Sequence, residues 1–273
     1  MKETLFSVLL TTYEGDTPQE LDAALDSTIN QTRPPEEIVL VKDGPLTEEL
    51  TAVVDSYVDR YPDLFSIHRL RENRGRGAAA AIGLKHCTND LVGIMSADDV
   101  NVSNRFERLI NFLKDNPEVD VVGGFIAEFD EELDEEIDTR EVPTDPEDIR
   151  QFALRRCPMN EVTVMFRKNA VLNVGGYRGL DKMEDYDLWV RLLVNGSTLA
   201  NIPEVLVHVR TGEGFSSRRG GFKYAREEIR QQIEFFKWGF LSFPRFIANV
   251  VTRVPLRLVG NSIRDKLYKI IAR

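Results

Sequence analysis

The sequence predicts an α/β protein whose mostly parallel sheet carries helices on both faces, with amphipathic helices added at the C-terminus. Short apolar runs rich in β-forming residues alternate with helical segments through roughly the first hundred residues. Acidic residues stand directly after two of these runs, at Asp43 and Asp98. The end of the chain is basic and has helical periodicity. Together these features indicate a sheet with a ligand site at one edge.

The first half of the chain alternates strand and helix signals. Thr17 and Pro18 begin one helix as its cap and first residue, and Glu20 completes a capping box. Parallel strands joined by helices have their ligand sites beyond the carboxyl ends of the strands. The predicted strands are 6–12, 38–41, 65–69 and 91–95, and the predicted helices are 18–29, 47–61 and 77–86.

The second half is less regular. Residues 119–142 indicate antiparallel strands joined by the acidic stretch 128–138, which we interpret as a solvated hairpin tip. We expect a further strand over 162–166 and a helix over 186–193.

Charge divides the chain in two. The 273 residues carry a net charge of −10, but those from Arg218 to the end carry +9 and the first 217 therefore carry −19. An acidic body argues against nucleic acid as a partner, and a basic end favours an anionic partner there. We expect a main domain over 1–220 and a basic helical extension over 221–273.

Apolar runs and cysteines point to the cytoplasm. No apolar run approaches the roughly 18 residues that a spanning helix needs, and the N-terminal run 5–10 is too short for a signal peptide. Cys87 and Cys157 fit free thiols better than a disulfide, and so few cysteines and histidines argue against a zinc site.

Five segments, taken in order, resemble the family 2 glycosyltransferases. They are 7–14, 31–44, 73–81, 96–99 and 175–189. Any one alone would be weak evidence, but five in this order over roughly residues 5–220 are a strong signal. The resemblance implies a GT-A type nucleotide-sugar-binding sheet. It also implies an inverting transfer of sugar from a nucleotide diphosphate-sugar, with uridine favoured as the nucleoside, to a saccharide or lipid-linked saccharide.

The paired carboxylates of the fourth segment suit a metal. Negative charge grows on the β-phosphate as the glycosidic bond breaks, and a divalent cation bound by carboxylate oxygens neutralises it. By resemblance, Asp98 binds Mn²⁺ or Mg²⁺, and Asp99 supports that site or contacts the sugar. The alternative is an Asp-Asp turn that caps the following helix.

The first three segments imply a nucleotide pocket. By resemblance, Asp43 contacts the base, Arg74 reaches the base or a phosphate, and the other residues line the pocket. The alternatives are an Asp-Gly tight turn for Asp43 and a solvated loop residue for Arg74. The full predicted set is Thr11, Tyr13, Glu14, Asp43, Arg74, Ala97 and Asp98.

The last segment carries the general base. Inverting transfer needs a group that takes the proton of the attacking acceptor hydroxyl. By resemblance, Asp185 is that base, and Glu184 helps to hold the acceptor or tunes the base. Trp189 is expected to pack under the acceptor sugar. The alternative is that the two carboxylates complement a helix dipole.

Arginines near the end of the resemblance suit the diphosphate. Arg210, Arg218 and Arg219 flank a glycine-containing segment, 211–215, that could close over an anion. His208 fits a strand histidine better than a metal ligand.

Two positions depart from the common family pattern. Ser96 replaces the first aspartate of Asp-x-Asp, which predicts weaker metal binding, and Glu161 stands where histidine is frequent, which predicts a different acceptor.

The basic end of the chain has two readings. Aromatic residues interleave at helical spacing with arginines at 245, 253, 257 and 264. This pattern suits a helix on the anionic inner face of the plasma membrane, and it equally suits helices packed on the main domain with a solvated basic face.

Two other functions compete with glycosyl transfer. A catalytically silent nucleotide-sugar-binding subunit would keep the sheet, and Ser96 leaves room for it. A sugar-phosphate nucleotidyltransferase would need a basic, glycine-rich loop after the first strand, and residues 11–16 contain no basic residue.

Overall fold

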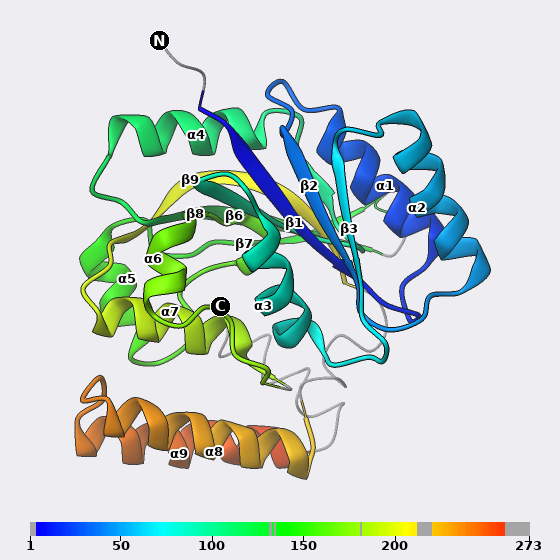
Figure 1. Ribbon diagram of the computed structural model, residues 1–273. Helices are drawn as coiled ribbons and strands as arrows, with labels where there is room; N and C mark the ends of the chain where they lie inside the picture. The colour runs from blue at the N-terminus through cyan, green and yellow to red at the C-terminus, as the bar shows by residue number, and fades with distance from the viewer. Residues whose placement is uncertain (1–3, 131–132, 134, 181, 212–219, 260–273) are drawn as a thin grey trace.

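The computed structural model describes residues 4–130, 133, 135–180, 182–211 and 220–259 (Figure 1). Within these residues, nine strands form one mixed sheet in the order β3-β2-β1-β4-β8-β6-β9-β5, and β7 pairs with β6. Helices cover both faces of the sheet, as the sequence predicts.

The parallel part of the sheet follows the predicted alternation. β1 pairs in parallel with β2 and β4, and β2 with β3. The Thr17 hydroxyl caps the first helix by accepting from the Glu20 amide at 3.3 Å. The strands are β1 (Phe6–Thr12), β2 (Glu37–Lys42), β3 (Phe65–Arg69) and β4 (Leu91–Ser96), and the helices are α1 (Pro18–Ile29), α2 (Glu48–Arg60) and α3 (Arg76–His86).

The second part of the sheet is mixed. The expected hairpin is confirmed by the antiparallel pair β6 and β7, whereas the long strand β9, parallel to β6, has no counterpart in the prediction. The expected strand over 162–166 is wrong in its first half, because Thr163 bonds back to the Asn160 carbonyl and closes a 3-10 turn. The strands are β5 (Val100–Asn101), β6 (Val121–Phe129), β7 (Glu136–Arg140), β8 (Met165–Arg167) and β9 (Leu199–Arg210).

The remaining helices surround this mixed part. The predicted helix over 186–193 is confirmed, and it begins two residues earlier, at Glu184. The helices are α4 (Arg105–Asp115), α5 (Pro146–Ala153), α6 (Lys168–Asn173), α7 (Glu184–Val194), α8 (Phe222–Lys237) and α9 (Phe243–Leu258), and the 3-10 turn is η1 (Glu161–Thr163).

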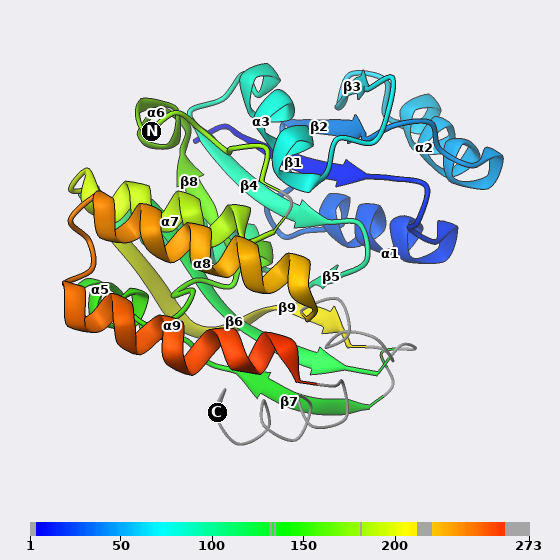
Figure 2. The ribbon, with the colours of Figure 1, turned by 90° about the horizontal axis from the view of Figure 1, so that it is seen from below.

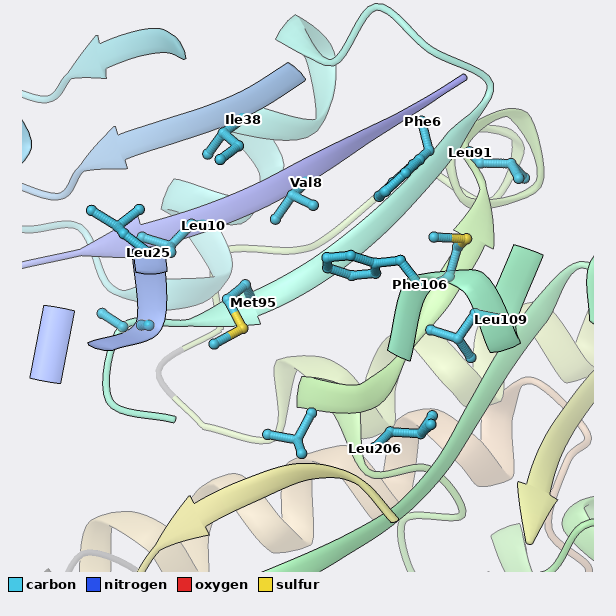
Figure 3. Close-up of a cluster of buried hydrophobic side chains, with 14 of the residues drawn as sticks. Phe6, Val8, Leu10, Leu25, Ile38, Leu91, Met95, Phe106, Leu109 and Leu206 are labelled. Atoms are coloured by element: carbon cyan, nitrogen blue, oxygen red, sulfur yellow. The ribbon is translucent and has the colours of Figure 1, made fainter. Parts of the chain in front are cut away.

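Alternate residues of β1 belong to two hydrophobic cores, one on each face of the sheet. Phe6, Val8 and Leu10 pack with α1, α2 and α4 on one face, and Figure 3 shows this cluster. The rings of Phe6 and Phe106 face each other there with centroids 5.0 Å apart. Leu9 points to the other face and packs with α3 and α7. This period of two fixes the register of the strands and hence the position of their ends.

The second core extends into the C-terminal helices. Phe235, Phe240 and Leu241 are buried in the same cluster as Tyr186 and Trp189 of α7. The predicted packing of this region on the main domain is therefore present over α8 and α9, and residues 260–273 lie outside the described part. In the ranges that the structure describes, no helix is both long and apolar enough to cross a membrane.

Candidate functional site

The carboxyl ends of β1 and β2 hold the predicted nucleotide residues. The Asp43 amide donates to the Thr12 carbonyl at 2.8 Å, and the Asp43 carboxylate accepts from the Arg74 amide at 2.8 Å. Gly44 has φ of +95°, and a Cβ there would lie 2.8 Å from the Asn73 amide nitrogen. The strand end and the Arg74 loop therefore approach more closely than any side chain at Gly44 would allow.

The loop after β1 is held by an aspartate that the prediction missed. One oxygen of Asp16 accepts from the Thr12 hydroxyl at 2.8 Å and from the Tyr13 amide at 3.0 Å. Burial raises the pKa of Asp16 to about 6, and the charge of Asp98 adds to the rise. Tyr13 and Glu14 are exposed at this edge. An Asp four residues beyond a strand end is a turn signal that could have identified Asp16.

The predicted metal residues lie at the end of β4. The Ser96 hydroxyl donates to the Asp98 carboxylate at 2.5 Å, and the Arg210 guanidinium donates to the Asp98 carbonyl at 2.6 Å. Asp99 is buried, and burial together with the charge of Asp98 raises its pKa to about 8. Ala97 is buried too, so its backbone is the part that could face a ligand.

This donor set fits a divalent cation only in part. Among the described residues no cluster of three His, Cys, Asp or Glu side chains could hold a metal. Asp99 Oδ1, however, is buried without a hydrogen-bond partner in the described part of the chain. Mg²⁺ is commonly held by one or two carboxylates plus substrate phosphates, so Asp98 and Asp99 fit a cation that arrives with a diphosphate.

The predicted base lies at the start of α7. Asp185 accepts a weak hydrogen bond from the Cys157 thiol, with Sγ to Oδ2 at 3.5 Å. Burial, and then the charge of Asp185, raises the pKa of Glu184. Met183, directly before the helix, has φ of +59°. A non-glycine residue in this region is strained, and such strain gathers at functional sites.

The prediction missed an ion pair between Arg76, which is partly exposed, and the buried Glu161. Arg76 Nη2 contacts Glu161 Oε2 at 2.7 Å, and Thr11 and Tyr177 line the same small cavity. The charge of Arg76 also opposes the rise in the pKa of Asp99 and of Glu184. Arg76 is therefore close to both the predicted metal residues and the predicted base.

Burial perturbs Glu161 most strongly. It raises the pKa of Glu161 to about 7, Arg76 opposes the rise, and the charges of Asp185 and Glu184 add to it. Because glutamate stands at position 161 where the family pattern has histidine, a third carboxylate lies near the predicted base. Arg76 is the counter-ion of this carboxylate.

Gly77 brings this constellation together. A Cβ at Gly77 would lie 2.5 Å from the Arg178 carbonyl oxygen and 3.0 Å from Glu184 Cβ. The first turn of α3, which carries Arg76, therefore contacts the first turn of α7, which carries the predicted base. Sequence reasoning placed each helix but had no signal for their contact.

Three predicted site residues are not part of the site in the described structure. Trp189 is fully buried in the second hydrophobic core, so the expectation that it packs under the acceptor sugar is wrong. Trp189 lies on the inner face of the amphipathic helix α7. Arg218 and Arg219 lie outside the described residues. His208 is a strand histidine, as predicted, with its ring 4.8 Å from that of Phe129.

Asp187 helps to hold α7 in place, although it lies two residues from the predicted base. It is fully buried and pairs with both Arg178 and Arg191, the latter at 2.8 Å. Arg191 also donates to the Gly176 carbonyl at 2.8 Å. The last motif of the sequence therefore combines the predicted base with the residues that anchor its helix.

Comparison with known proteins identifies the family. The family profile described as "Glycosyl transferase family 2" matches residues 7–180. An uncharacterised glycosyltransferase of Haemophilus influenzae is 38% identical over 98% of this chain and 99% of its own length. A UDP-Gal:α-D-GlcNAc-diphosphoundecaprenol β-1,3-galactosyltransferase of Escherichia coli is 37% identical over 98% of this chain and 96% of its own.

Solved structures share the fold at low identity. A Pyrobaculum calidifontis mannosyltransferase in complex with GDP-Man and Mn²⁺ aligns with a TM-score of 0.68 at 16% identity, over 99% of this chain and 76% of that one. Residues 1–349 of Staphylococcus aureus TarS in complex with UDP-GlcNAc align with a TM-score of 0.66 at 15% identity, with the same coverage. These likenesses establish the GT-A type fold. From the family profile and the close relatives, this chain belongs to glycosyl transferase family 2.

Proposed function

We propose that this glycosyltransferase moves a hexose from a UDP-sugar to a saccharide carried on a lipid diphosphate, with inversion at the anomeric carbon. The observation that carries the proposal is that two pairs of carboxylates lie close to Arg76. They are Asp98 with Asp99 and Glu184 with Asp185. The 37% identity to an enzyme named for UDP-Gal and a diphosphoundecaprenol acceptor supports the donor and acceptor classes.

In the proposed reaction the acceptor hydroxyl oxygen attacks the anomeric carbon, and Asp185 takes its proton. The bond from the anomeric carbon to the β-phosphate oxygen breaks, and its electron pair leaves with UDP. Asp98 and Asp99 would hold Mn²⁺ or Mg²⁺, which supplies charge stabilisation to the leaving diphosphate. Arg210, bonded to the Asp98 carbonyl, adds a cation at the same edge.

The donor pocket follows from the strand ends. Asp43 would contact the uracil, and Thr11, Tyr13, Glu14, Arg74 and Ala97 would line the pocket around it. Asp43 is suited to this because its position is fixed by the bonds to Thr12 and Arg74. Glu184 and Glu161 would face the acceptor.

The test is a panel of nucleotide-sugars with Mn²⁺, Mg²⁺ or chelator, offered with a saccharide diphosphate-lipid acceptor. We expect metal-dependent transfer from one UDP-sugar and a β-linked product by NMR when the donor is α-linked. Asp98→Ala should lose metal-dependent donor binding, and Asp63→Asn, an exposed aspartate in a distant turn, is the control. Donor binding without transfer to any acceptor would favour a silent subunit, and failure to bind any nucleotide-sugar would contradict the proposal.

A further inference from the structure

The helix α9 is amphipathic, but its polar face is turned inward and its apolar face outward. Its inner face is polar: Asn249 donates to Gln232 at 2.9 Å, and Arg253 and Arg257 both pair with the fully buried Glu228. The sequence suggested that these arginines face solvent or lipid, and in the structure they face α8 instead. A helix on a water-soluble surface normally buries its apolar side.

The outer face of α9 is correspondingly apolar. Val251 is 65% exposed, Phe243 61% and Leu258 51%. Ile247, Pro244, Ala248 and Pro255 are exposed on the same side, and Thr252 is the polar residue at its edge. Contiguous exposed apolar surface of this kind marks a contact with something apolar.

The outer face of α8 adds aromatic and basic groups. Phe236 and Phe243 touch at the turn between the helices, with ring centroids 6.1 Å apart, and join the two faces. Arg226, Arg230 and Lys237 are exposed on the outer side of α8. Figure 2 looks onto this two-helix layer, which lies in front of α7. Apolar and basic groups side by side match the acyl boundary and the phosphates of an anionic membrane.

We propose that the outer face of α8 and α9 docks the protein on an anionic bilayer. The face lies one helix away from the candidate base, because Gln231 of α8 donates to the carbonyl of Met183, directly before Glu184, at 3.0 Å. Docking there would bring the site to the surface from which a lipid-linked acceptor is presented. The inference rests on the proposed function for this purpose, but its test requires no catalysis.

The test is flotation of the full chain with phosphatidylcholine vesicles, with and without phosphatidylglycerol, at low and high salt. We expect binding to the anionic vesicles that weakens with salt. Ile247→Glu with Val251→Glu should lower binding at least roughly tenfold, because each change removes an inserted apolar side chain. Leu172→Glu, on the exposed part of α6, is the matched control and should bind as the wild type does.

A second pair of variants isolates the charge. Arg230→Gln with Lys237→Gln should lower binding to anionic vesicles by about tenfold and leave the residual binding to phosphatidylcholine unchanged. Wild-type protein that ignores anionic vesicles at low salt, or a glutamate variant that floats as well as wild type, would overturn the proposal. A wild-type dimer that the glutamate variant converts to a monomer, without flotation, would assign the face to a second copy and also overturn it.

Transfer to a short-tailed, water-soluble acceptor separates this inference from the proposed function. The outer-face variants should keep that activity while losing transfer to vesicle-bound acceptor. Flotation without transfer to any acceptor would sustain the docking face and contradict the proposed reaction.

Discussion

The proposed donor edge, at the ends of β1, β2 and β4, and the proposed acceptor side, around the start of α7, are built differently. The donor edge consists of strand ends whose polar residues bond to their own or adjacent loops, as in Thr12 with Asp16 and Ser96 with Asp98. The acceptor side joins Arg76, Glu161 and Asp185, which come from three distant parts of the chain. Topology alone fixes the first, whereas helix packing and buried charge fix the second. The acceptor side should therefore be the more sensitive to single substitutions.

The largest expected effect is on the anchor of α7. Asp187→Asn leaves Arg191 buried without its counter-ion and should lower the free energy of unfolding by about 3 kcal/mol. Urea denaturation measures it, with Asp63→Asn in an exposed turn as the control. Stability equal to wild type would mean that the pair does not hold the acceptor side together.

The contact between α3 and α7 should be nearly as sensitive. Gly77→Ala would push a Cβ against the Arg178 carbonyl and should cost about 2 kcal/mol of stability, with a fall in transfer larger than the fall in donor binding. Gly179→Ala is the matched control, since its Cβ would meet Ala78 at an ordinary 3.5 Å. Equal losses in the two variants would contradict the close approach.

These two positions show where sequence reasoning ended. The strands, the crossover helices and the polar residues after β2 and β4 follow from local patterns, because each pattern lies within one segment. Arg76 and Glu161 are separated by 85 positions, and no local pattern pairs them. Trp189 was misplaced for a related reason: its motif position suggests the site, but its burial depends on a core that α7 shares with distant parts of the chain.

The ion pair of Glu161 with Arg76 should make the stability of the protein depend on pH. The pKa of Glu161 is raised to about 7, so its contribution to stability is full below its unfolded value near 4.5 and is lost as pH rises through about 7. Glu161→Gln should therefore gain stability relative to wild type between pH 5 and 8, by roughly 2–3 kcal/mol.

Thermal or urea unfolding of both proteins at several pH values measures this gain. Glu118→Gln, in an exposed loop, should show no such trend. A difference between wild type and Glu161→Gln that stays constant with pH would mean that the glutamate is not strained by burial and its acidic neighbours.

The smallest effect is expected on the donor edge. Ser96→Ala removes the hydrogen bond that orients the Asp98 carboxylate, a loss of about 1 kcal/mol. The metal concentration for half-maximal transfer should rise about fivefold with little change in kcat or stability. Titration with Mn²⁺ at saturating donor measures it. An unchanged metal requirement would place the cation away from Asp98.

The most direct test of the account compares donor binding with single-turnover transfer in Asp185→Asn. We predict UDP-sugar binding equal to wild type by calorimetry, with transfer slowed about a thousandfold, because the variant keeps the donor edge and loses the proton acceptor. Asp63→Asn should match wild type in both measurements. Transfer by Asp185→Asn at the wild-type rate would contradict the assignment of the base, and with it the division of the site into a donor edge and an acceptor side.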